Sequence, residues 1–117
     1  MKTIFNNLKE ITFFVDDVIN ASEYYKNIFG EPVFKSDCFV LYNINFINIG
    51  LHQSDEKSSD SKGNMVPYFL IENIDNTIKY LVSYNFKMYR EKIKGIDGSY
   101  VCQLISPFNN VIGLIQE

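Results

Sequence analysis

Histidine and cysteine are the residue types best suited to transfer protons or act as nucleophiles near neutral pH, and their spacing in this sequence supports no familiar catalytic arrangement. His52 is the only histidine, and Cys38 and Cys102 lie far apart with no CxxC pair. A Ser–His or Cys–His pair would need His52, yet the sequence contains no GxSxG segment. The phosphate-binding patterns GxxxxGK[ST] and GxGxxG are also missing. We expect both cysteines to be free, buried thiols.

Composition sets the limits within which any site must be built. The chain has 117 residues, of which 46% are hydrophobic and 21% charged, and its net charge is −3. These values indicate one small soluble domain. The absence of a basic patch argues against a nucleic-acid partner. Because no apolar run is long enough for a membrane span and the start does not resemble a signal peptide, we expect a cytoplasmic protein without a membrane partner.

The elements that would position these side chains are predicted from hydrophobic spacing. Glu10–Val15 reads as a strand, Asp17 as the N-cap of a helix, and Gly30 as its C-terminal stop. Three further strands are expected at Val33–Phe34, Cys38–Tyr42 and Phe46–His52. The first half of the chain therefore predicts a βαβββ order.

The second half repeats that order. A strand at Tyr68–Ile71 is followed by the N-cap candidate Asn73 and a helix, and then by strands at Phe86–Glu91, Ser99–Ile105 and Val111–Gln116. A shift of 56 residues places Asp17 on Asn73. A shift of 63 residues places Ile49–Gln53 on Ile112–Gln116, with four of five residues identical. We interpret the chain as one domain made of two modules.

The module boundaries follow from the polar segment between the repeats. Residues 1–54 form the first module, 55–65 a charged linker containing Ser and Gly, and 66–117 the second module. The alternative for residues 54–66 is a loop or lid beside a pocket.

Two motifs at the ends of the repeat resemble those of the vicinal oxygen chelate superfamily, which includes glyoxalase I, extradiol dioxygenases, fosfomycin-resistance enzymes and bleomycin-resistance proteins. Residues 14–30, FVDDVINASEYYKNIFG, resemble the opening V-x-D-x-x-x-(S/A)-x-x-F-Y-x-x-x-L-G of that family. Residues 106–114, SPFNNVIGL, resemble its closing D-P-x-G-N-x-(I/V)-x-L. Ser106 and Asn109 depart from the usual Asp and Gly. The resemblance implies an α+β fold in which two βαβββ modules form a curved mixed sheet around a cavity, usually in a homodimer.

Alternation along each strand separates cavity-facing from helix-facing side chains. Ile11, Phe13 and Val15 are expected to face the helix. The cavity side would receive the ligand-pocket candidates, which are Glu10, Thr12, Phe14, Gly50, His52, Tyr68, Leu70 and Gly113. Glycine within a strand often marks the close approach of a ligand or another chain segment. The aromatic content of 15% also suits a pocket for an organic molecule.

The metal-ligand positions implied by the family can be read against this sequence. They fall on Glu10, Gly50, Val66 and Gly113, of which only Glu10 could bind a cation. A catalytic divalent site needs about three protein ligands and an open position. We therefore expect no metal and no other cofactor.

Three functions compete on these observations. The first is a metal-independent protein, resembling bleomycin-resistance proteins, that sequesters a hydrophobic or cationic small molecule in a dimer pocket. The second is an enzyme of the glyoxalase, isomerase, lyase or dioxygenase type, with a metal or with Glu10 or His52 as acid–base groups. The third is a structural or regulatory domain with a vestigial cavity. We favour the first, and catalytic residues cannot be assigned.

Overall fold

The computed structural model describes residues 4–57 and 64–117, so most of the predicted linker lies outside the described residues. These residues divide into two compact units. The N-terminal unit is Glu10–Val66, and the C-terminal unit combines the residues before Glu10 with Pro67–Glu117. Strand β1 (Phe5–Val15) contributes to both units. No helix of the described residues is long and apolar enough to cross a membrane.

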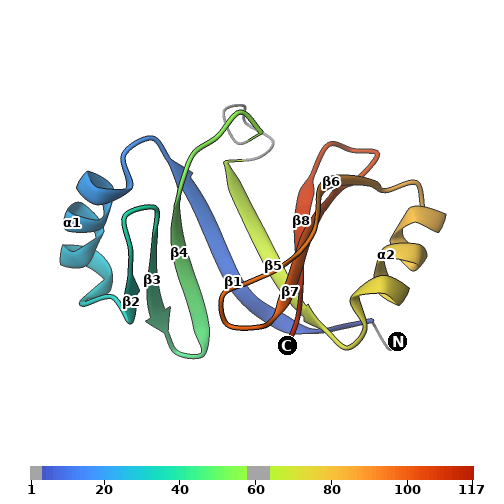
Figure 1. Ribbon diagram of the computed structural model, residues 1–117, viewed down its shortest axis with the longest axis horizontal. Coiled ribbons are helices and arrows are strands. Elements are labelled where there is room, and N and C mark those ends of the chain that lie inside the picture. Colours follow the sequence, from blue (N-terminus) through green and yellow to red (C-terminus); the bar gives the residue numbers. More distant parts are fainter. Residues whose placement is uncertain (1–3, 58–63) are drawn as a thin grey trace. The chain divides into compact units, whose positions relative to one another are not determined.

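The N-terminal unit has the predicted βαβββ order (Figure 1). After β1 come α1 (Val18–Phe29), β2 (Phe34–Lys35), β3 (Phe39–Ile44) and β4 (Ile47–Gln53). The strand order in the sheet is β2-β3-β4-β1. Strands β1 and β4 pair in parallel, whereas the other two pairs are antiparallel. The α1 crossover permits the parallel pairing, because two parallel neighbours cannot be joined by a tight turn.

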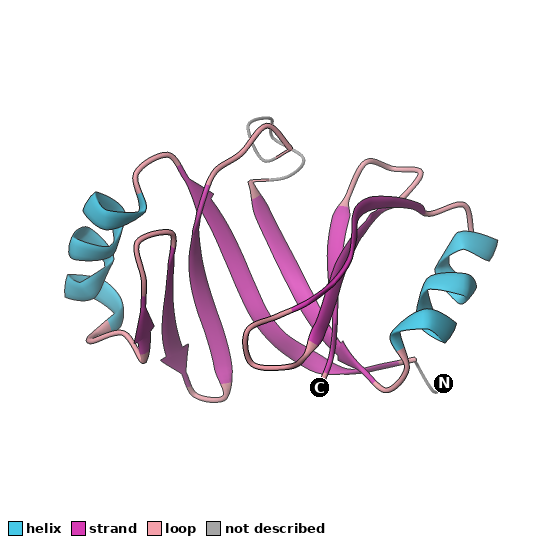
Figure 2. Ribbon diagram, viewed as in Figure 1, coloured by secondary structure: helices cyan, strands magenta, loops and turns pink. Residues whose placement is uncertain are grey.

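The C-terminal unit repeats this arrangement with β5 (Met65–Ile71), α2 (Ile74–Ser83), β6 (Lys87–Lys94), β7 (Tyr100–Ile105) and β8 (Val111–Gln116). Its strand order is β5-β8-β7-β6, with β5 and β8 parallel. Figure 2 shows one helix beside the strands of each unit. The α+β class and the pair of βαβββ modules are thus as predicted.

Both helices begin as the sequence repeat predicts. Asp17 and Asn73 are the N-caps, and their side-chain oxygens accept hydrogen bonds from the amides of Asn20 at 3.1 Å and Asn76 at 3.0 Å. The last strand of each module adds a second bond. The Oε1 of Gln53 accepts from the Val18 amide at 3.3 Å, and that of Gln116 accepts from the Ile74 amide at 2.7 Å. The repeated glutamine therefore satisfies helix N–H groups that have no partner within the helix.

The closing motif keeps its turn despite its two departures from the family pattern. Asn109 has a φ of 67°, a left-handed conformation that Asn tolerates better than most residues. The Ser106 hydroxyl accepts hydrogen bonds from the amides of Phe108 and Asn110, at 3.1 and 3.2 Å. A short oxygen-bearing side chain at position 106 thus stabilises the turn in place of Asp.

Strand β1 begins five residues earlier than the predicted Glu10. The early part contains Asn6, Asn7 and Lys9, whose polarity hides the strand pattern in the sequence. Burial explains why this segment is nevertheless extended, since Ile4 and Phe5 pack against the hydrophobic core of the C-terminal unit. Tertiary packing therefore outweighs the poor strand propensity of these residues.

Each unit has its own core between helix and sheet. In the N-terminal unit Val18 of α1 packs with Val40, Tyr42 and Leu51. In the C-terminal unit Ile74 and Leu81 of α2 pack with β-strand residues, among them Ile71, Cys102, Leu104 and Leu114. Both cysteines are free, as expected, but only Cys102 is buried. The expectation that Cys38 is buried is wrong, because it lies in the exposed turn before β3.

The two thiols should differ sharply in reactivity. Burial raises the pKa of the Cys102 thiol to about 12. At pH 8 only about one Cys102 in ten thousand would then be a thiolate, the form that attacks disulfide reagents. We expect one rapid equivalent of Ellman's reagent from Cys38 and a second only on unfolding in guanidinium. Two equally fast thiols in the native protein would contradict the described core.

Candidate functional site

The predicted pocket residues fall into two sets, one in each unit. Glu10, Thr12, Phe14, Gly50 and His52 lie in the N-terminal unit, whereas Tyr68, Leu70 and Gly113 lie in the C-terminal unit. Within each unit the strand register places its set on one face of the sheet, the face opposite the helix.

In the N-terminal unit, strand pairing arranges the candidates in rows. Thr12 is paired with Gly50, and Phe14 with His52. On the other side of β4, His52 is paired with Phe39. The alternate residues Phe13 and Val15 pack in the α1 core, as alternation predicts. Side chains from β1, β3 and β4 therefore meet on the face away from α1.

The Glu10 carboxylate lies over Gly50. A Cβ added at Gly50 would be 3.0 Å from Oε2 of Glu10 and 3.1 Å from Cε1 of Phe39. The hydroxyl of Thr12, a residue that is only 3% exposed, donates to Oε2 of Glu10 at 2.5 Å. This charge-assisted hydrogen bond holds the carboxylate in place. The glycine thus leaves room for a positioned, partly exposed carboxylate beside an aromatic ring.

Aromatic rings surround this position. The His52 ring lies 5.2 Å from the Phe14 ring and 5.7 Å from the Phe39 ring, and Phe34 extends the group at 6.2 Å from Phe39. Nδ1 of His52 is 2.9 Å from the backbone oxygen of Gln53. A carbonyl oxygen can only accept, so Nδ1 carries the proton and Nε2 is the acceptor when the ring is neutral. We call Glu10, Phe14, Phe34, Phe39 and His52 the carboxylate–aromatic face.

The residues at the four metal positions that the sequence resemblance implies do not fit a divalent cation. Val66 is fully buried and Gly50 and Gly113 carry no side chain, so Glu10 alone offers a ligand atom. Within residues 4–57 and 64–117, no three His, Cys, Asp or Glu side chains are grouped so that they could hold a metal ion. One carboxylate falls short of the usual three protein ligands.

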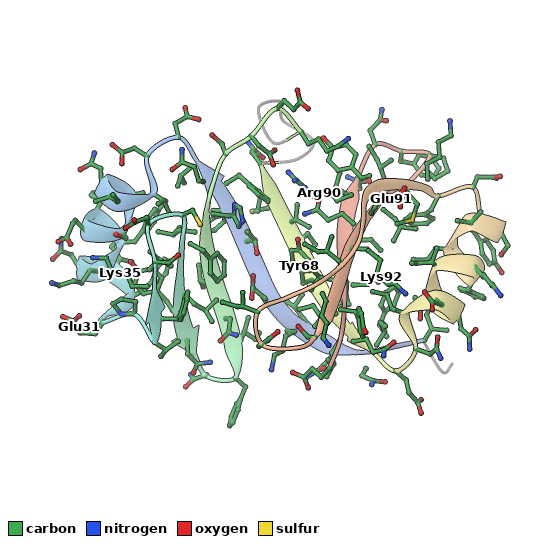
Figure 3. All side chains as sticks on the ribbon, viewed as in Figure 1. Glu31, Lys35, Tyr68, Arg90, Glu91 and Lys92 are labelled. Atoms are coloured by element: carbon green, nitrogen blue, oxygen red, sulfur yellow. The ribbon has the colours of Figure 1, made fainter. Side chains whose placement is uncertain are left out.

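In the C-terminal unit, Gly113 makes room for the ring of Tyr68. Tyr68 is paired with Gly113 across β5 and β8, and the tyrosine ring covers the glycine so closely that an added Cβ would clash with it. The Tyr68 hydroxyl oxygen accepts a hydrogen bond from Nε2 of Gln103 at 2.7 Å. Oε1 of Gln103 in turn accepts from Nε of Arg90 at 3.0 Å. In Figure 3 the side chains of Tyr68 and Arg90 lie on the side of these strands away from α2.

Gln103 and Arg90 are not among the site residues that the sequence predicts. One signal was present, because Gln103 is a single amide within the otherwise apolar Val101–Ile105, and a polar residue at such a position needs a partner. Arg90 offered no comparable signal. Its side chain is placed by an irregularity in the β6–β7 pairing, where the register shifts between Met88 and Arg90.

The contact between Gly113 and Tyr68 predicts a specific cost for adding one methyl group. Gly113→Ala should lower the free energy of unfolding by about 1–3 kcal/mol, because the base of a rigid ring must move. Urea unfolding measures this loss. Gly50→Ala is the matched control and should cost less, since its added Cβ would lie 3.0 Å from Oε2 of Glu10 and 3.1 Å from Cε1 of Phe39, which are milder contacts. If Gly113→Ala costs as much in a Tyr68→Ala background as in the wild type, the ring is not the cause.

No protein-family model matches the sequence. No curated protein matches it either. Many solved structures do resemble it.

Methylmalonyl-CoA epimerase from Mycobacterium tuberculosis superposes with a TM-score of 0.75 at 18% identity, covering 99% of this chain and 91% of that one. A glyoxalase/bleomycin resistance protein/dioxygenase superfamily member from Vibrio splendidus 12B01 gives a TM-score of 0.66 at 13% identity, covering 92% and 96%. The Mn(II)-bound glyoxalase from Novosphingobium aromaticivorans gives 0.70 at 14% identity, covering 98% of this chain and 40% of that one. The repeated βαβββ module and these likenesses together show that the chain has the fold of the vicinal oxygen chelate superfamily.

Proposed function

We propose that this protein binds a small organic cation with an apolar body, without a metal ion. The observation that carries the proposal is the carboxylate–aromatic face, where the Glu10 carboxylate is held over Gly50 beside the Phe39 ring. Aromatic rings attract cations through their negative faces, and a carboxylate adds direct charge pairing. The rings also offer apolar contact area for the rest of the molecule.

Binding is a better match to these residues than metal-dependent catalysis. Solved structures with this fold include proteins named as epimerases and as a Mn(II)-bound glyoxalase. In this chain, Glu10 is the one ligand-bearing residue among the four positions where the family would place a metal. The carboxylate–aromatic face suits an organic molecule, whereas the four positions hold no set of ligands for a metal ion. A role in sequestering a compound, as in bleomycin-resistance proteins, follows from this combination.

The proposal is tested with benzyltrimethylammonium as the probe and its neutral isostere neopentylbenzene as the comparison. Calorimetric titration in EDTA should give saturable binding of the cation and at least tenfold weaker binding of the isostere, about 1.4 kcal/mol. Glu10→Gln should weaken cation binding by about tenfold to a hundredfold, the range for loss of a charged contact. Glu31→Gln removes an exposed carboxylate from the same unit and should have little effect.

Two results would count against this function. One is equal affinity of the wild type and Glu10→Gln for the cation. The other is a rise in the unfolding midpoint with a single divalent metal among Mg²⁺, Mn²⁺, Fe²⁺, Co²⁺, Ni²⁺ and Zn²⁺. A native-state ligand at about 100 times its Kd stabilises by about 2.7 kcal/mol, which is readily seen in a domain of this size.

The proposal includes a homodimer. Support comes from large apolar side chains that remain exposed in the N-terminal unit, such as Val33 at 63% and Phe46 at 92%. Such side chains are typical of surfaces that associate when they are contiguous. Light scattering after gel filtration should give twice the chain mass of 13.6 kDa. A single-chain mass at micromolar concentration would remove the dimer from the proposal and leave the carboxylate–aromatic face as it is.

A further inference from the structure

One row of the N-terminal sheet carries polar residues from three neighbouring strands. Glu10 on β1 is paired with Asn48 on β4, and Asn48 is paired with Asn43 on β3. The flanking residues Tyr42 and Ile49 pack in the α1 core, so Asn43 and Asn48 lie on the opposite face of the sheet. The two asparagines therefore lie on the same side of the sheet as the carboxylate–aromatic face.

Asn43 and Asn48, which we call the amide pair, are joined by one hydrogen bond. Nδ2 of Asn43 donates to Oδ1 of Asn48 at 2.9 Å. Within residues 4–57 and 64–117, neither side-chain amide has another hydrogen-bond partner. Asn43 is exposed and Asn48 is half-buried. Because every amide has both a carbonyl oxygen and an NH₂ group, a single bond between two of them leaves donors and acceptors available, whichever amide donates.

The second module shows that the fold does not need polar residues at these two places. Counted from the glycine of the last strand, the equivalents of Asn43 and Asn48 are Ile105 and Val111, which are paired in the same way across β7 and β8. Val111 is only 5% exposed. An apolar cross-strand pair satisfies the sheet at this position as well as a polar one can. Strand pairing alone therefore does not account for the two amides in the first module.

The spacing along β4 relates the amide pair to the aromatic rings. The Phe39 ring reaches over Gly50, where an added Cβ would be 3.1 Å from Cε1 of the ring. Asn48 lies on the same strand and the same face, two residues before Gly50, which is a distance of about 7 Å along the strand. A molecule whose aromatic part contacts Phe39 therefore needs an arm of about that length to reach the amides.

We infer that the amide pair binds a carboxamide group at the end of such an arm. A carboxamide has a carbonyl oxygen that accepts and N–H groups that donate, so it can use a donor and an acceptor of the pair together. An ammonium group offers donors alone and a carboxylate acceptors alone, so each matches half of what the pair presents. The inference rests on the proposed function, and it narrows the ligand to an organic cation that also carries a carboxamide.

A neutral probe tests the amide pair separately from the cation. The side-chain NH₂ groups of Asn43 and Asn48 give their own signals in the ¹H–¹⁵N correlation spectrum and report contact directly. We expect saturable shifts of these signals with 4-phenylbutanamide. The isosteric ketone 5-phenylpentan-2-one keeps the ring, the arm and the carbonyl oxygen but has no N–H group. It should bind about threefold to tenfold more weakly, which corresponds to the loss of one hydrogen bond.

The second module supplies a variant that should keep the fold. Asn43→Ile combined with Asn48→Val copies the apolar pair of β7 and β8 into the first module. Followed through the backbone amides of β4, this double variant should bind the amide no more tightly than the ketone. It should bind benzyltrimethylammonium within about twofold of the wild type, since Thr12 holds the Glu10 carboxylate. Asn20→Ala is the matched control, because it removes an exposed asparagine of α1 and should retain the preference for the amide.

Two results would overturn the amide subsite. The first is a wild-type protein that shows no saturable shift with the amide, or that binds the amide and the ketone equally well. The second is a double variant that is folded, by its backbone amide spectrum, and still prefers the amide. The wild-type comparison of the two probes decides the question should the double variant fail to fold. Glu10→Gln should weaken benzyltrimethylammonium but leave 4-phenylbutanamide unchanged, so failure of the cation proposal is distinguishable from failure of the subsite.

Discussion

Parallel pairing between the first and last strands of each βαβββ module is the constraint on which the other features depend. It sets Thr12 beside Gly50 in one unit and Tyr68 beside Gly113 in the other. The glutamine that ends each module then reaches the first amide of its own helix. Strand register, helix start and the position of the glycine are thereby linked, and a slip of one residue would exchange the two faces of the sheet.

The same scaffold fills the space over its glycine differently in its two copies. Where the first strand offers a small hydroxyl, the space over the glycine is taken by a carboxylate from the preceding row. Where the first strand offers tyrosine, the ring fills that space over the glycine of β8. The tyrosine hydroxyl then contacts Gln103 on β7, two strands away from β5. One change of side-chain size beside a glycine thus decides whether the space over that glycine holds a carboxylate or an aromatic ring.

The features that were predicted correctly from the sequence, such as helix starts and strand alternation, depend on local pattern. Asp17 and Asn73 cap helices because their side chains suit that position, and alternation placed Phe13 with the helix and Glu10 on the opposite face. Features that depend on distant partners escaped prediction. The early part of β1 is polar, and it is extended because Ile4 and Phe5 pack against the hydrophobic core of the C-terminal unit. The bulge that places Arg90 on the face opposite Met88 cannot be recognised in the sequence KMYREKIK, because it arises from the pairing of β6 with β7.

That bulge has an evolutionary consequence. Loss of a single codon between Met88 and Arg90 would remove the extra residue, and a regular ladder would then keep Met88 opposite Leu104 and the only arginine opposite Gln103. Strand β6 is the last strand in its unit's order, so such a change in length would disturb pairing with β7 alone. The orientation of the arginine would thus survive loss of the bulge, and this edge strand can change its length by one residue without moving the side chain to the other face.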